Sequence, residues 1–167
     1  MFSFYNRHNN NLYNKLVEFS RNIFFYKDLN LKDNFETRII LIFLHFSIIL
    51  LKYRKVNKEK FPQEIFDNIF VNIEYHLREL GYGDVAVNKK MKILNRFFYD
   101  ILLKIDKSKD SNLIINKSVL KEHLFQEDQV KDVYIDKLTN YFESFYNFCF
   151  EIKDKNMIKG LINFKYY

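Results

Sequence analysis

The chain has 167 residues, of which 48% are apolar and 29% are charged. This length and balance suit one folded domain with a buried core and exclude a disordered chain. The formal net charge of +6 favours anionic partners such as RNA, a ribosome surface or lipid head groups, and plain solubility explains it equally well.

A scarcity of turn residues predicts an all-α fold. The sequence has three Gly and one Pro, fewer than sandwiches or barrels usually need. Cys149 is the only cysteine, which excludes an intrachain disulfide and a thiolate zinc site, so a reducing compartment is expected. Residues 1–15 lack the apolar core and the small-residue cleavage site of a signal peptide.

In chain order, the first predicted helix covers residues 11–25, because apolar side chains recur there at spacings of three and four. Asp33 is expected to open the second helix, with Glu36 three positions on as in a capping box. Residues 39–51 are apolar almost throughout and too few to span a bilayer, so they predict the most buried helix.

The third predicted helix covers residues 62–80, with Pro62 at its start and Gly81 at its C-terminal cap. After a tight linker, Asn88 is expected to cap a fourth helix that continues to residue 105.

The last third of the chain predicts a short helix over residues 118–125 and a long helix over residues 128–152. The apolar tail 157–164 is expected to dock on the body. Residues 1–167 are therefore expected to form a single irregular bundle of five to seven helices.

Basic residues follow the apolar run. Cations near the C-terminus of a helix interact favourably with its dipole, which gives Lys52, Arg54 and Lys55 a local structural role. The cluster comprises Lys52, Arg54, Lys55, Lys58 and Lys60.

The turn between the third and fourth predicted helices is the candidate partner-binding site. Glu74 and Arg78 are four positions apart, in the favourable order for a helical ion pair. Asp84 can meet either Arg78 or the exposed amides at the next helix start. For Arg78, Glu79 and Asp84 the sequence leaves open both a structural role in the turn and direct contact with a partner.

Lys89, Lys90 and Lys92 are expected in the first turn of the fourth helix, where the helix dipole disfavours cations. An anion at this helix start would reverse the effect, because free amides and lysines would both face it. Phosphate of ribosomal RNA or a lipid head group would serve. The alternative is a solvated lysine run in a lysine-rich chain.

The sequence predicts no metal site, no cofactor and no catalysis. His76 and Glu79 reverse the Glu-x-x-His order of di-iron bundles and occur once. Gly81-x-Gly83 lacks the strand and the third glycine of a nucleotide loop. No Ser-His-Asp or Cys-His set has supporting context. His45, on the most buried helix, is expected to be a hydrogen-bonded core residue.

Short motifs occur in a fixed order over residues 35–105. They are Leu44-His45 in the long apolar helix, Phe66-Asp67 with Phe70 close behind, the run Arg78-Glu79-Leu80-Gly81-Tyr82-Gly83-Asp84, and then Val87 and Lys90-Met91-Lys92. This region resembles the ubiquinol-cytochrome c chaperone family, whose most specific pattern is Arg-Glu-apolar-Gly-x-Gly-Asp. The chain departs from the family at Glu74-Tyr75, Leu80 and Tyr82, and residues 106–167 resemble it only weakly.

The resemblance implies a non-enzymatic assembly factor for cytochrome b and the bc1 complex. Mitochondrial relatives act with a second chaperone, contact the ribosome near its exit tunnel and hold newly made cytochrome b. The expected partners are therefore cytochrome b, a second assembly chaperone, and a ribosome or anionic membrane surface, without DNA. The expected location is the cytoplasm, either free or peripheral on the inner membrane, whereas mitochondrial relatives face the matrix.

The expected partner-binding residues gather at the turn and the fourth helix, and three others are structural or family positions. The first set is Arg78, Glu79, Gly81, Tyr82, Gly83, Asp84, Lys89, Lys90 and Lys92, and the second is His45, Asp67 and Glu74.

Two other functions stay open. The net charge and the two lysine clusters also fit a basic helical module that docks on a ribosome or membrane without a cytochrome-specific client. A helical carrier or enzyme for a lipid or quinone would use a pocket beside residues 39–51.

Overall fold

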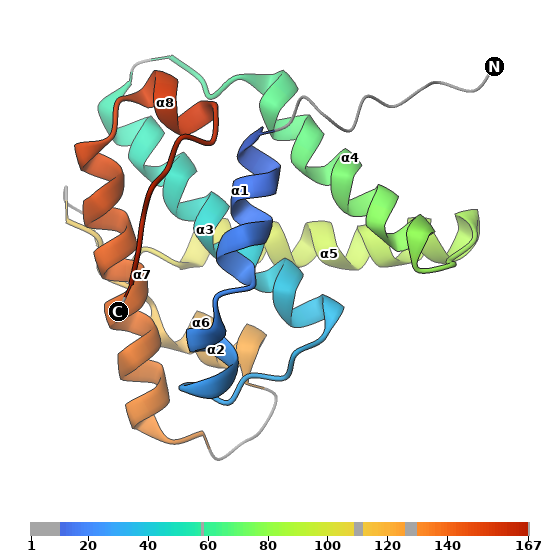
Figure 1. Ribbon diagram of the computed structural model, residues 1–167, viewed down its shortest axis with the longest axis horizontal. Coiled ribbons are helices and arrows are strands. Elements are labelled where there is room, and N and C mark those ends of the chain that lie inside the picture. Colours follow the sequence, from blue (N-terminus) through green and yellow to red (C-terminus); the bar gives the residue numbers. More distant parts are fainter. Residues whose placement is uncertain (1–10, 58, 109–111, 126–129, 167) are drawn as a thin grey trace.

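Eight helices are formed by the residues that this computed structural model describes, which are 11–57, 59–108, 112–125 and 130–166. Six of the helices have eight residues or more, and two have five. Within these ranges the β-structure consists of an isolated antiparallel bridge between Asp106 and Ile115. The predicted all-α bundle is confirmed. In chain order the helices are α1 (Asn11–Ser20), α2 (Ile23–Lys27), α3 (Phe35–Val56), α4 (Gln63–Glu79), α5 (Asp84–Lys104), α6 (Lys117–Leu124), α7 (Asp132–Glu151) and α8 (Asp154–Ile158) (Figure 1).

The longest helix, α3, is enclosed by the others. Every residue from 39 to 49 is buried, so neighbours must cover this helix on all sides, and α1, α5, α6 and α7 contact it. The predicted central helix is therefore confirmed. Within the described ranges, no helix combines the length and the apolar character that crossing a membrane requires.

The helix predicted over residues 11–25 is interrupted, so this prediction is wrong. α1 ends at Ser20, whose hydroxyl donates to the carbonyl of Val17 at 2.7 Å. The side chain of Asn22 then caps α2 by accepting a hydrogen bond from the amide of Phe24. Ser and Asn side chains compete with helical backbone bonds, whereas the apolar periodicity continues through the break and does not reveal it.

The starts of three other helices differ from prediction, and one of them is α7, which begins at Asp132 and not at about residue 128. Asn34, and not Asp33, caps α3 by accepting a hydrogen bond from the amide of Thr37 at 2.9 Å. α5 begins earlier than expected, with Gly83 as its N-cap residue. Asn88 therefore lies inside α5 and is not its cap.

The basic segment that ends α3 is held by carboxylates of the same chain. The Lys52 side chain is 3% exposed and forms an ion pair with Asp154, and Lys55 Nζ lies 3.2 Å from a carboxylate oxygen of Asp106. The dipole of α3 is therefore only part of what stabilises these two lysines at the helix end, because ion pairs with residues far along the chain also hold them. Lys58 lies outside the described residues.

The C-terminal tail docks on the body, as predicted. Met157 and Ile162 are buried. The ring of Phe164 meets the rings of Phe19 and Phe145 edge to face, at centroid distances of 6.4 and 5.2 Å. The last described residues therefore complete the packing around the first helix.

Gly160 lets the tail approach α1 closely. Its φ of +73° lies in the left-handed region, and a methyl group added there would lie 2.4 Å from the carbonyl oxygen of Asn11. Only glycine satisfies both the backbone angle and the space.

Candidate partner-binding site

The predicted site lies at the turn between α4 and α5. The two helices pack against each other and end together at one extreme of the molecule's long axis (Figure 1). Gly81 has a φ of +95°, its amide donates to the carbonyl of Arg78 at 3.0 Å, and the amide of Tyr82 donates to the carbonyl of Leu77 at 3.3 Å. These amides are used inside the turn, so the turn offers fewer backbone donors outward than expected.

Arg78 joins the two helices across the turn. Its guanidinium contacts Glu74 at 2.9 Å and forms a second ion pair with Asp84, the first residue of α5. The hydrogen bond with Asp84, followed by that with Glu74, raises the pKa of Arg78 above its usual value. Asp84 also lies at the positive end of the α5 dipole, which helps to fix the helix start there. These three residues therefore set the shape of the turn, and Glu79 beside them is exposed.

The three lysines of the site lie farther along α5 than predicted. Because α5 begins at Asp84, they lie beyond its first turn, and the expected anion site at a helix start is wrong in its position. Lys89 and Lys92 are exposed, while Lys90 places its Nζ 4.5 Å from the ring centroid of Tyr82. Among the residues that the structure describes, no carboxylate forms an ion pair with any of the three.

The turn also exposes apolar side chains, of which only Tyr82 was expected from the sequence to bind a partner. Leu80 is 58% exposed, Tyr82 is 40% exposed and Val85 is 72% exposed. A methyl group added at Gly81 or Gly83 would meet nothing within 4 Å. The signal was present in the sequence as Leu80 and Val85 on either side of a glycine turn, but their exposure depends on how the two helices project.

His45 lies far from this turn, in the core of the bundle. Its Nδ1 hydrogen-bonds with the carbonyl of Leu41 at 2.6 Å, so Nε2 accepts from the hydroxyl of Tyr141 at 2.8 Å. Burial lowers the pKa of His45 to about 4. The imidazole is therefore neutral near pH 7.

Asp67 and His76, two other polar residues of α4, have local partners. The Asp67 carboxylate accepts a hydrogen bond from Gln63 Nε2 at 2.7 Å on the exposed side of the helix. His76 Nδ1 lies 2.9 Å from the hydroxyl of Tyr13 and so ties α4 to α1. The structure brings neither residue to the turn.

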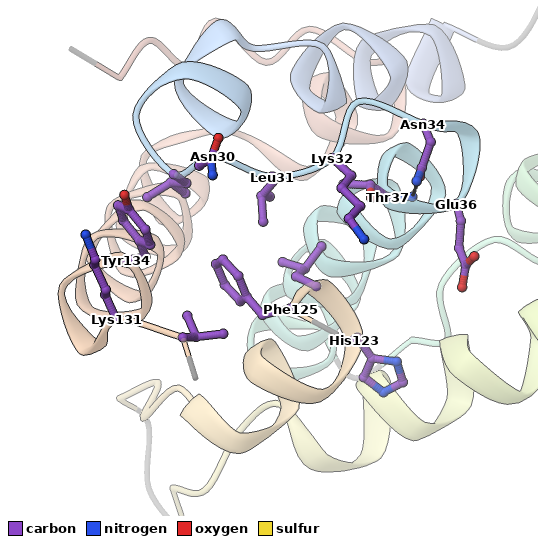
Figure 2. Close-up of a pocket in the computed structure, with 13 residues that line it drawn as sticks. Asn30, Leu31, Lys32, Asn34, Glu36, Thr37, His123, Phe125, Lys131 and Tyr134 are labelled. Carbon is purple, nitrogen blue, oxygen red and sulfur yellow. Dashed lines mark hydrogen bonds between the residues drawn. The ribbon is translucent and has the colours of Figure 1, made fainter. Parts of the chain in front are cut away.

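A pocket of about 450 Å³ lies in a second region, between the connection before α3 and the facing ends of α6 and α7. Leu31 and Phe125 point toward one another across it, and Lys131, the N-cap residue of α7, and Tyr134 of α7 line one side (Figure 2). Lys32 also lines it. The pocket lies beside the start of α3 and not along residues 39–51. No periodic motif marks it in the sequence, because irregular connections build it.

A cluster of possible metal ligands lies near this pocket. One ligand atom from each of Asp100, Glu122 and His123 falls within 4.8 Å of the others. However, Asp100 pairs with Lys104 through one oxygen and with His123 Nε2 at 2.8 Å through the other. The hydrogen bond from Lys104 is the main cause of the lowered pKa of Asp100. Groups of the chain itself thus engage both oxygens of this carboxylate.

The chain belongs to the ubiquinol-cytochrome c chaperone family, whose sequence model matches residues 27–164. The match extends well beyond residues 35–105, where the resemblance was expected to be concentrated. A solved structure, the Cbp3 homolog from Brucella abortus, has a TM-score of 0.70 and 25% sequence identity, over 93% of this chain and 87% of that chain. A comparison with curated proteins finds no match.

Proposed function

We propose that this member of the chaperone family binds newly made cytochrome b and promotes its assembly into the bc1 complex. The observation that carries the proposal is the family match over residues 27–164, together with the similarity in fold to the Brucella abortus structure. From the same resemblance, we propose that a second assembly chaperone is its partner protein in this step.

Two buried groups, His45 and Cys149, are not poised for proton transfer. Burial lowers the pKa of His45 to about 4 and raises the pKa of the Cys149 thiol to about 12. Neither group exchanges protons near pH 7, as a general acid, a general base or a thiolate nucleophile would need to do.

We propose that the client binds at the pocket beside Leu31 and Phe125, between the connection before α3 and the facing ends of α6 and α7. A chaperone for a membrane protein needs apolar surface that a client can reach. The partly exposed rings of Phe125 and Tyr134 supply it, beside the buried side chain of Leu31 and the polar side chains of Lys32 and Lys131 (Figure 2). This arrangement suits an apolar segment whose ends remain in water.

Deletion of the gene tests the function. The expected result is loss of assembled bc1 complex with other respiratory complexes unaffected, restored by the wild-type chain and poorly restored by Phe125→Ser. Unchanged cytochrome b levels in the deletion strain would reject the proposal.

Crosslinking in intact cells tests the surface. A photoreactive amino acid at position 125 is expected to capture cytochrome b. The matched control is position 161, because Leu161 is 62% exposed and lies on the C-terminal tail. Equal capture from both positions would contradict the assignment of the pocket.

A basic docking module without a cytochrome-specific client is the second candidate function. The absence of carboxylate partners for Lys89, Lys90 and Lys92 among the described residues favours it. Such binding weakens steeply as salt rises. Pull-downs at low salt that return ribosomes or membranes but never cytochrome b would support this function over the first.

A further inference from the structure

The solvent-facing side of α5 carries a continuous stripe of exposed side chains. Six residues follow one another at spacings of four and three, which places them on one face of a helix with roughly 3.6 residues per turn. All six are exposed, and we call them the α5 outer stripe: Val85, Lys89, Lys92, Arg96, Tyr99 and Leu103.

The opposite side of α5 faces the core. Val87, Leu94, Phe98 and Ile101 are buried there, and α5 packs on α3, α4 and α6. The outer stripe therefore faces away from those helices, and no described residue of the chain covers it.

The stripe combines cations with aliphatic side chains. Val85 is 72% exposed and Leu103 is 80% exposed, at the two ends of a stripe that has three cations and no acid. In the described part of the chain, no carboxylate forms an ion pair with Lys89, Lys92 or Arg96. Asp100, at the edge of the stripe, is engaged by Lys104 and His123.

This composition matches an anionic bilayer surface. Phosphates of RNA would attract the cations but would gain nothing from the exposed aliphatic groups of Val85 and Leu103. In a membrane interface, cations reach anionic head groups, aliphatic side chains enter the acyl boundary, and Tyr rings lie between the two. An anionic bilayer thus offers partners for both the cations and the apolar side chains, whereas nucleic acid offers partners only for the cations.

We propose that the α5 outer stripe forms a membrane-contact surface for anionic lipid. α5 lies flat on the bilayer, and its 21 residues extend for about 31 Å along the surface. The Arg78–Asp84 ion pair holds the turn at the end of this surface. The surface goes beyond the proposed client binding and does not depend on it.

Vesicle flotation tests the proposal with the full chain. Vesicles of phosphatidylcholine alone are compared with vesicles that contain about one third phosphatidylglycerol. The wild-type chain is expected to float with the anionic vesicles. Because each cation near the surface contributes about 1 kcal/mol, the Lys89→Gln/Lys92→Gln/Arg96→Gln variant is expected to bind about a hundredfold more weakly.

A second variant tests the apolar part. Val85→Ser/Leu103→Ser keeps the charge, so binding at low salt is expected to persist, while the residual binding at high salt is lost. The matched control for charge is Lys153→Gln/Lys155→Gln/Lys159→Gln, which removes three exposed cations around α8 and is expected to bind as the wild type does. Circular dichroism melts show whether each variant remains folded.

Three outcomes would overturn the membrane-contact surface. One is failure of the folded wild-type chain to bind anionic vesicles. The second is equal weakening by the α8 control, which would show a dependence on net charge alone. The third is unchanged vesicle binding by the α5 variant, and loss of ribosome binding by the same variant in a parallel pull-down would then assign the stripe to RNA. Bc1 assembly in the deletion strain is a separate readout, so a failure here leaves the proposed client function standing.

Discussion

The two lysine-rich segments of the chain use their charge in opposite ways. At the end of α3, Lys52 is buried and paired with Asp154, and Lys55 reaches both Asp106 and the hydroxyl of Tyr146 at 3.2 Å. On α5, by contrast, the cations of the outer stripe face water, and no described carboxylate pairs with them. Runs that look alike in sequence therefore differ in role, and the available tertiary partners decide which run stabilises the fold and which remains for a ligand.

The largest expected effect is at the buried pair. Asp154→Ala leaves the Lys52 ammonium buried and uncompensated, so we expect the free energy of unfolding to fall by about 3–5 kcal/mol. Urea denaturation at pH 7 measures this change. Asp67→Ala, which removes an exposed carboxylate, is the control and should change stability little. Adding Lys52→Met to Asp154→Ala should recover most of the loss, and no recovery would show that the pair is not the cause.

The second largest expected effect is the pH dependence of the free energy of unfolding that His45 causes. Burial lowers its folded pKa to about 4, whereas the unfolded chain has a pKa of about 6.5. Between these values the unfolded state binds more protons, so stability is full above pH 6.5 and falls as the pH drops toward 4, by about 3 kcal/mol. Denaturant midpoints at successive pH values measure the slope. His45→Gln should flatten this window, and an unchanged slope would assign it to other groups.

Lys55 and Asp106 give a smaller effect. Burial raises the pKa of Asp106, but hydrogen bonds from Ser108, the Ile114 amide and Lys55 outweigh it, so the pKa lies below its ordinary value. The associated stability is present at neutral pH and is lost as the pH falls below about 4. Lys55→Met should lower the free energy of unfolding by about 1 kcal/mol at pH 7 and move the pKa of Asp106 upward. Carboxyl NMR titration would detect the shift, and an unmoved pKa would contradict the interpretation.

The smallest effect on stability is expected on α5. Lys89→Gln/Lys92→Gln removes two exposed cations without ion-pair partners in the described chain, so the free energy of unfolding should change by less than about 0.5 kcal/mol. The same urea denaturation measures it. A large destabilisation here would erase the contrast between the two lysine-rich segments.

Much of the fold could be predicted from local sequence signals. The uniform apolar run 39–51 gave the enclosed helix, and Pro62 and Gly81 gave the limits of α4 within a residue. The interruption at Asn22 and the early start of α5 could not be predicted. Several polar side chains in each region could cap a helix, and the sequence does not show that Asn22 accepts from the amide of Phe24 or that Asp84 pairs with Arg78.

The sites were less predictable than the helices. The turn between α4 and α5 was found through its motif, and its Glu74–Arg78 pair through helical spacing. The partner of Lys52 lies 102 positions away, and the pocket beside Leu31 and Phe125 joins connections that no periodic pattern links. Contacts of this range follow from the packing of the whole bundle and not from any local segment.

The close approach of Gly160 to Asn11, with Phe164 packed on Phe19, bears on the timing of folding during synthesis. α1 is synthesised before the tail segment 157–164 that packs on it, although α3 and α4, which also contact α1, lie between the two in the chain. The packing around α1 is therefore completed only after residues 157–164 have left the ribosome, and until then the part of α1 that the tail covers is open to other cellular components.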